Sequence, residues 1–127
     1  MTVEEMHGVR VLTIPGEGPA LRDGADALDL VAATYEHQAD FVAIPVERFD
    51  PEFFTLGNGL AGDFLQKLVN YRLRVAIIGD LSEQTAASKA LRDFVWESNR
   101  RGQNWFLATR EELRARLGGE AEGGPEA

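Results

Sequence analysis

Few residue types in this sequence could carry out acid–base, nucleophilic or metal chemistry. The 127 residues include no cysteine, and the two histidines, His7 and His37, lack the close spacing of paired metal ligands. No segment has the G-x-S-x-G form that presents a serine nucleophile. We therefore predict no metal site and no disulfide. The groups left for general acid–base work are carboxylates, and the candidates among them are Asp80 and Glu97.

The segment from Gly57 to Gly62 has the form G-x-G-x-x-G, and Asp80 follows it at the end of a buried apolar run. In dinucleotide-binding proteins such glycines admit a pyrophosphate to a helix N-terminus. Here residues 50–56 separate the glycines from the preceding strand, and the chain is too short for two mononucleotide-binding halves, so we expect no cofactor. Two interpretations stay open. The amides of residues 59–61 bind a carboxylate or phosphate, or the glycines allow a tight turn into a packed helix.

The other candidate residues lie near the ends of predicted elements. Asp80 could be a base or a binding carboxylate, or could simply form an Asx turn or cap the next helix. Polar groups near helix ends, such as Asn70 and Asn99, bond the last carbonyls or line a polar pocket. The residues that we select for ligand or partner binding are Thr55, Asn58, Gly59, Gly62, Asn70, Asp80, Arg92 and Asn99.

Strands and helices alternate in the elements that must position these side chains. Short β-branched or apolar runs predict strands at 9–14, 41–46, 73–78 and 104–107. Helical spacing of apolar residues predicts helices at 25–38, at 58–72, from residue 88 at the latest, and after Thr109. Thr109 and Glu112 form a capping box, and Gly118–Gly119 ends the last helix. The β-α-β-α-β-α-β-α order predicts an α/β fold with a mostly parallel sheet of four or five strands.

One connection, residues 47–57, contains the large apolar residues Phe49, Phe53, Phe54 and Leu56. These side chains need cover, so we expect the connection to fold onto the core, with a turn at Asp50–Pro51. The chain length supports one domain, which we place at residues 1–117. The Gly- and Glu-rich segment 118–127 is predicted to be a disordered acidic tail.

Charge and hydropathy limit which kinds of partner we expect for this chain. The net charge is −8, with an acidic first half and a basic segment at residues 67–117. Such a chain repels nucleic acid and anionic lipid on average, so neither is an expected partner, whereas its two halves permit self-association into a homo-oligomer. No run approaches the roughly 18 apolar residues of a membrane span. The first residues do not resemble a signal peptide, and we expect a cytoplasmic protein.

Several motifs together resemble a known family. The chain resembles the uncharacterised bacterial family called domain of unknown function 4180 over about residues 9–115, and the family name implies no activity. The motifs that carry the resemblance are residues 53–62, Leu65-Gln66-Lys67, Val69-Asn70-Tyr71-Arg72, residues 75–80, Ser88-Lys89, Leu91-Arg92-Asp93-Phe94 and Glu97-Ser98-Asn99.

A looser similarity is to STAS domains and SpoIIAA-like proteins, in Asn58-Gly59-Leu60 at a helix start and in residues 74–80. It implies a compact α/β fold that acts through protein contacts or a small ligand. Phosphorylated relatives carry an Asp-Ser-Ser-Gly-Leu-like motif at this helix start. Here Asn58 stands there and cannot accept a phosphoryl group, and the extra helix at 25–38 departs from the usual N-terminal β-hairpin.

We predict a non-catalytic, regulatory module that binds a protein partner, itself or a small ligand. Its contact surface would be residues 55–62 together with Asp80. The alternative hypothesis is a small cytoplasmic enzyme or binding protein for a metabolite, in which Asp80 and Glu97 are the acid–base groups. The orienting groups in that alternative would be Asn58, Asn70 and Arg92.

Overall fold

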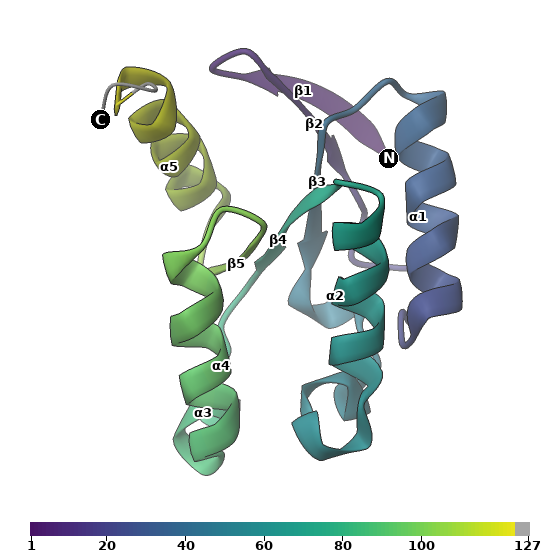
Figure 1. Cartoon of the computed structure of the whole chain (residues 1–127), viewed down its shortest axis with the longest axis vertical. Helices are drawn as coiled ribbons and strands as arrows, with labels where there is room; N and C mark the ends of the chain where they lie inside the picture. The colour runs from purple at the N-terminus through teal and green to yellow at the C-terminus, as the bar shows by residue number, and fades with distance from the viewer. Residues whose placement is uncertain (124–127) are drawn as a thin grey trace.

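The structure, a computed structural model, describes residues 1–123 and contains one five-stranded sheet (Figure 1). The strands lie side by side in the order of the chain: β1 (Thr2–Met6), β2 (Val9–Thr13), β3 (Phe41–Pro45), β4 (Arg74–Ile78) and β5 (Asn104–Leu107). β1 pairs with β2 in antiparallel fashion, and every other neighbouring pair is parallel. This confirms the α/β class and the mostly parallel sheet, with five strands.

The helices connect the parallel strands as the alternating pattern predicts. They are α1 (Gly24–Glu36), α2 (Leu60–Asn70), α3 (Ser82–Ala87), α4 (Lys89–Arg100) and α5 (Arg110–Gly123). Three 3-10 turns, η1 (Val46–Arg48), η2 (Pro51–Phe54) and η3 (Leu56–Asn58), fill the connection between β3 and α2. Within residues 1–123, no helix has the length and apolar character needed to cross a membrane.

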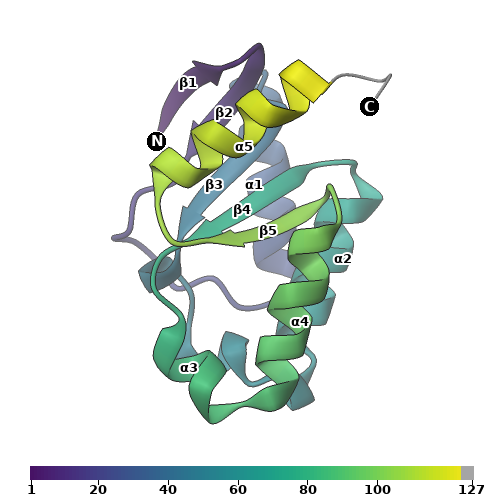
Figure 2. The same cartoon turned by 90° about the vertical axis from the view of Figure 1, so that its left-hand side faces the viewer.

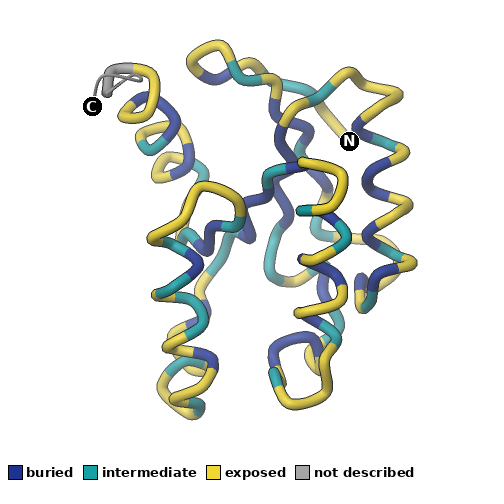
Figure 3. Tube along the Cα trace, viewed as in Figure 1, coloured by how far each residue is buried: buried dark blue, intermediate teal, exposed yellow. Residues whose placement is uncertain are grey.

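The core has two layers, one on each face of the sheet. Leu12, Val42 and Val75 are buried on the face that α1, α2 and α4 cover. Phe41 and Trp105 lie on the opposite face, where α5 supplies the buried side chains of Leu113 and Leu117. Figure 2 shows α5 running obliquely across the strands on its own side, and Figure 3 shows the buried residues concentrated along the sheet.

The strand β1 is absent from the predicted element order, which begins at residue 9. Thr2–Met6 is short and carries Glu4 and Glu5, so its sequence has little apolar alternation. It forms because a tight turn at His7–Gly8, with φ of 49° and 85°, folds it back onto β2. The charged residues suit a strand at the edge of the sheet, where they discourage pairing with another chain.

The last helix continues past Gly118–Gly119 to Gly123, so its predicted end is wrong. Gly118 is buried, and a Cβ atom there would lie 2.8 Å from Nε2 of His7. The glycine therefore permits close packing of α5 against the β1–β2 turn. Glu120, in the segment predicted to be disordered, bonds Arg74 of β4 at 2.9 Å. The remainder of that predicted tail, residues 124–127, lies outside the described residues.

The connection between β3 and α2 folds onto the core, as its phenylalanines predict. Phe49, Phe53 and Phe54 are buried; the rings of Phe49 and Phe53 contact Phe64 of α2, and Phe54 contacts Phe49 and Phe53. The ring centroids of Phe49 and Phe53 are 4.3 Å apart, and those of Phe53 and Phe64 are 5.4 Å apart and perpendicular. This phenylalanine cluster fixes the position of η1, η2 and η3 beneath the carboxyl edge of the sheet, where the candidate site lies.

Candidate functional site

The start of α2 uses its polar groups within the chain. The Asn58 side chain donates from Nδ2 to the Glu52 carbonyl at 2.7 Å and accepts from the Leu60 amide at 2.9 Å. The Gly59 amide donates to the Leu56 carbonyl at 3.2 Å. Two of the three amides proposed for an anion, those of residues 59 and 60, are thus already bonded. The geometry favours a glycine-dependent turn into the helix over a phosphate site.

Only one of the glycines in this motif has a conformation that requires glycine. Gly59 has φ of 81°, whereas Gly62 lies in the first turn of α2, and a Cβ atom there would meet nothing within 4 Å. We expect Gly59→Ala to lower the free energy of unfolding by about 1 kcal/mol, because the left-handed region strains an L side chain. We expect Gly62→Ala to raise it by about 0.5–1 kcal/mol through helix propensity. Urea unfolding of both variants tests this, and a loss of stability in Gly62→Ala would contradict it.

Asp80 forms the local turn that was one of its two interpretations. Its Oδ1 accepts from the Ser82 amide at 2.8 Å at the start of α3. Hydrogen bonds from the Ser82 side chain and backbone hold the pKa of the Asp80 carboxyl below its usual value. A general base works best with a pKa near the working pH, so this shift makes Asp80 a poorer base.

The candidate residues on the second half of the chain also have partners. Glu97 pairs with Arg100 and Arg101, at 3.4 and 3.2 Å, in the last turn of α4. Asn99 bonds the Phe106 backbone of β5 at both its amide and its carbonyl. Asn70 accepts from the Gln66 side chain at 2.9 Å. Arg92 donates to the Thr85 carbonyl at 3.3 Å.

The structure does not bring Asp80 and Glu97 together. Asp80 follows the carboxyl end of β4, whereas Glu97 lies near the end of α4, which leads into the amino end of β5 (Figure 2). Since β4 and β5 are parallel, the two carboxylates lie toward opposite edges of the sheet. Glu97 borders a hollow of about 250 Å³ with Phe94, Ser98 and Arg101, and Asp80 is not among its lining residues.

Among the predicted binding residues, Thr55 borders a surface depression, together with Gly57 of the glycine motif. A hollow of about 340 Å³ lies between η2–η3 and the junction of α3 with α4, and a second of about 360 Å³ adjoins it. Both share Pro51, Phe54 and Gln84, and we call the continuous depression the Phe54 groove. Its other lining residues are Val46, Glu47, Phe49, Thr55, Leu56, Gly57, Ala87, Ser88, Ala90 and Leu91.

Sequence reasoning missed the far wall of the Phe54 groove. Gln84, Ala87 and Ala90 come from α3 and the start of α4, about one strand and one helix beyond η2 in the chain. Nothing in their local pattern distinguishes them from solvent-facing helix positions. The sequence indicated only the near wall of the groove, through the apolar residues of segment 47–57.

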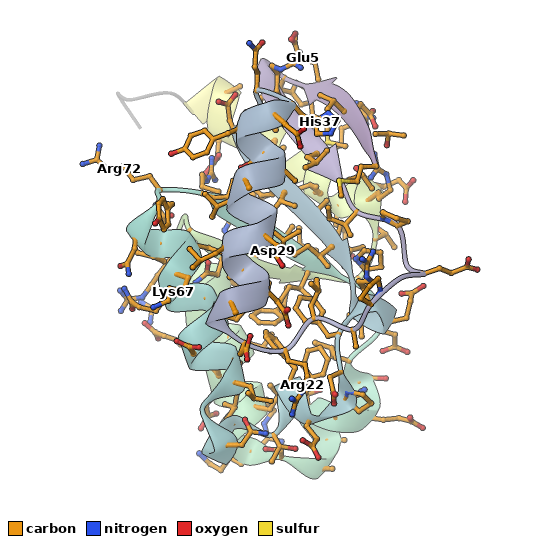
Figure 4. The ribbon with its side chains drawn as sticks, turned by 90° about the vertical axis from the view of Figure 1, so that its right-hand side faces the viewer. Glu5, Arg22, Asp29, His37, Lys67 and Arg72 are labelled. Atoms are coloured by element: carbon orange, nitrogen blue, oxygen red, sulfur yellow. The ribbon has the colours of Figure 1, made fainter. Side chains whose placement is uncertain are left out.

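Ion pairs within the chain partly neutralise the acidic first half and the basic segment at residues 67–117. Glu4 of the acidic half accepts from Arg110 and Arg114 of α5, and the two guanidinium groups hold the pKa of Glu4 below its usual value. The outer surface of α1 and α2 carries charges of both signs, including Asp29 and Lys67 (Figure 4). In the part of the chain from residue 1 to 123, no three His, Cys, Asp or Glu residues form a group that could hold a metal ion.

These features define a single-sheet α/β protein whose crossover helices share one face. The family model described as Domain of unknown function (DUF4180) matches residues 6–117, and the chain belongs to this family. The family resemblance read from the motifs is thereby confirmed. No curated protein and no solved structure matches the chain, so the similarity to STAS domains stays a prediction.

Proposed function

We propose that this chain is a non-catalytic binding module that holds an apolar segment of a partner protein in the Phe54 groove. The observation that carries the proposal is the groove itself, whose base is Phe54, Leu56 and Leu91 and whose rim includes exposed Pro51. Contact of apolar side chains with such a surface removes both from water, at roughly 25 cal/mol per Å².

The walls of the groove suit a polypeptide. Gly57, Ala87 and Ala90 are exposed and small, so a partner backbone could approach closely. The exposed side chains of Thr55 and Gln84 offer a hydroxyl and an amide for hydrogen bonds to that backbone. An apolar base with a few polar groups at the rim is the usual arrangement of a protein interface.

The placement of the carboxylates supports a non-catalytic role. Asp80 bonds the Ser82 amide in a local turn, and Glu97 pairs with two arginines toward the other edge of the sheet, so an acid–base pair would need another set of residues. We propose that the partner is a different protein. Binding to a second copy of this chain is the alternative that the test below distinguishes. We propose a bacterial, cytoplasmic and regulatory setting for this binding, which fractionation of host cells would examine.

A substitution in the groove wall tests the proposal. We expect Ala87→Arg, and separately Ala90→Arg, to weaken partner binding at least about tenfold, because the long charged side chain occupies the groove. Both positions are exposed on helices, so the fold should tolerate arginine. The measurement is the dissociation constant for a partner identified by pull-down and mass spectrometry from host lysate and then purified.

The neighbouring residue supplies a matched control. Ala86→Arg places the same side chain on α3 at an exposed position that does not line the groove, and it should bind the partner like the wild type. Equal affinity of the Ala86 and Ala87 variants would refute the groove as the docking site. Light scattering distinguishes a self-partner, since the wild type would then dimerise and Ala87→Arg would be monomeric.

A further inference from the structure

The path of the chain opens a crevice at the carboxyl edge of the sheet. The segments after β2, β3 and β4 lead to helices on one face, whereas the segment after β5 leads to α5 on the other face (Figures 1 and 2). Open α/β sheets bind ligands beyond the carboxyl ends of the strands, at the point where successive connections diverge to opposite faces. In this chain that point lies between β4 and β5.

A cavity of about 250 Å³ lies beside this position, over β2, β3 and β4 on the face of the sheet that α5 covers. Its lining comes from the ends of β2, β3 and β4, from η1 and from the first residue of α5: Thr13, Ala43, Pro45, Ile78, Glu47 and Arg110. Ala43, Pro45 and Ile78 make an apolar base, and Glu47 and Arg110 add one charge of each sign. The volume falls below the roughly 300 Å³ at which drug-sized pockets begin, so it suits one small molecule.

The guanidinium group of Arg110 is held in place by hydrogen bonds, and its positive charge is only partly neutralised by its neighbours. It donates to the Thr13 hydroxyl at 2.7 Å and to the Glu4 carboxylate. Glu4 also accepts from Arg114, so one carboxylate faces two guanidinium groups, and one positive charge of the three residues stays uncompensated. A pre-positioned arginine of this kind is a strong partner for a carboxylate.

Glu47 provides the opposite charge without a partner of its own. Its side chain is exposed, and within residues 1–123 it makes no salt bridge and no side-chain hydrogen bond. It lies against Gly16, where a Cβ atom would be 3.0 Å from Oε2 of Glu47. The carboxylate is therefore available to a cation that enters the cavity.

We propose that this crevice binds a free α-amino acid with an apolar side chain. The carboxylate of the amino acid pairs with Arg110, its ammonium group pairs with Glu47, and its side chain contacts Ala43, Pro45 and Ile78. A ligand with one charge of each sign fits the site better than a simple anion, because Glu47 repels an anion. This inference goes beyond the proposed function. Glu47 also borders the Phe54 groove, but no step of the inference rests on that groove.

The experiment is a titration of the ¹⁵N-labelled full chain with L-leucine, followed by NMR. We expect saturable shifts of the backbone amides of Thr13, Glu47, Ile78 and Arg110. N-acetyl-leucine lacks the ammonium charge and leucinamide lacks the carboxylate, so each should bind at least about tenfold more weakly than leucine, a loss of about 1.4 kcal/mol or more.

Variants at the two ends of the site give opposite patterns. Glu47→Gln should bind leucine at least about tenfold more weakly. It should bind N-acetyl-leucine at least as tightly as the wild type does, since that analogue has no ammonium group and glutamine does not repel its carboxylate. Arg110→Gln should lose leucine binding and bind leucinamide at least as tightly as the wild type does, because leucinamide has no carboxylate and glutamine does not repel its ammonium group. Glu83→Gln, an exposed carboxylate on α3 outside the cavity, is the control and should bind leucine normally.

Clear results would overturn the inference. It fails if leucine produces no saturable shifts at tens of millimolar, if the two analogues bind as well as leucine, or if the shifts lie away from the crevice. Arg110 also anchors Glu4 of β1, so Arg110→Gln could alter the fold. Glu47→Gln carries the test by itself in that case, because Glu47 is exposed and its side chain forms no salt bridge within residues 1–123.

Discussion

Replacing Phe53 by alanine should lower the free energy of unfolding by about 3–5 kcal/mol, as expected for a buried aromatic side chain that leaves a cavity. Phe53 is fully buried, and its ring lies within 5.4 Å, between centroids, of the rings of Phe49, Phe54 and Phe64. A domain of this size has a total stability of about 5–15 kcal/mol, so the variant would lose a large part of it. Urea unfolding followed by circular dichroism measures the change.

Two further variants separate cavity formation from the loss of any aromatic residue. Phe53→Leu keeps most of the buried apolar volume and should cost clearly less than Phe53→Ala. Tyr35→Ala removes a ring that is 70% exposed and should change stability by less than about 0.5 kcal/mol. If Phe53→Ala cost no more than Tyr35→Ala, the phenylalanine cluster would not be the support of the β3–α2 connection.

The second large effect is expected at Asn99, where alanine should cost about 2–3 kcal/mol. The Asn99 side chain accepts from the Phe106 amide at 2.7 Å and donates to the Phe106 carbonyl at 3.0 Å, as a neighbouring strand would do. Phe106 is buried in the edge strand β5, so removal of the side chain leaves a backbone donor and a backbone acceptor without their partner. Each such buried group costs about 1–3 kcal/mol.

Asn70 offers a matched control for Asn99. Both asparagines lie near the end of a helix, but Asn70 is exposed and bonds only the Gln66 side chain. Asn70→Ala should change the free energy of unfolding by less than about 0.5 kcal/mol. Similar losses of stability in the two variants would show that the two hydrogen bonds from Asn99 to Phe106 contribute nothing. Hydrogen exchange of the Phe106 amide gives an independent readout, which should speed up only in Asn99→Ala.

Both effects bear on how binding should be studied. Phe49 and Phe54 belong to the phenylalanine cluster and also line the Phe54 groove, so the core and the proposed docking surface share side chains. A substitution there would change stability and binding together. The exposed residues Ala87 and Glu47 avoid this coupling, because neither belongs to the buried core.

Local pattern was sufficient to predict most elements. The apolar runs at 41–46 and 73–78 are strands, and Pro45 lies at a strand end as its missing amide donor requires. At the start of α5 the Thr109 hydroxyl accepts from the Glu112 amide, as the predicted capping box requires, whereas the Glu112 carboxylate accepts from the amide of Ala108, one residue before the cap. These features depend on side-chain period, turn chemistry and helix ends, which neighbouring residues specify.

Local pattern also predicted that the β3–α2 connection would pack onto the core. It did not predict the hydrogen-bond partners of all the candidate residues. Asn58 and Asp80 bond amides two residues away and fit the local interpretations. Asn99 instead bonds a strand residue beyond the next turn, and a sequence pattern of helix ends does not distinguish this contact from a polar pocket.

The remaining features depend on residues that are distant in the chain. β1 forms through pairing with β2 and ion pairs from Glu4 to α5, although its own residues have little strand pattern. Gly118 continues a helix because it packs against His7, whereas a glycine at that position by itself predicts an end. The crevice between Glu47 and Arg110 exists because α5 crosses to the other face of the sheet. That crossing follows from burial of Leu113 and Leu117 against Trp105, a long-range contact that no local spacing specifies.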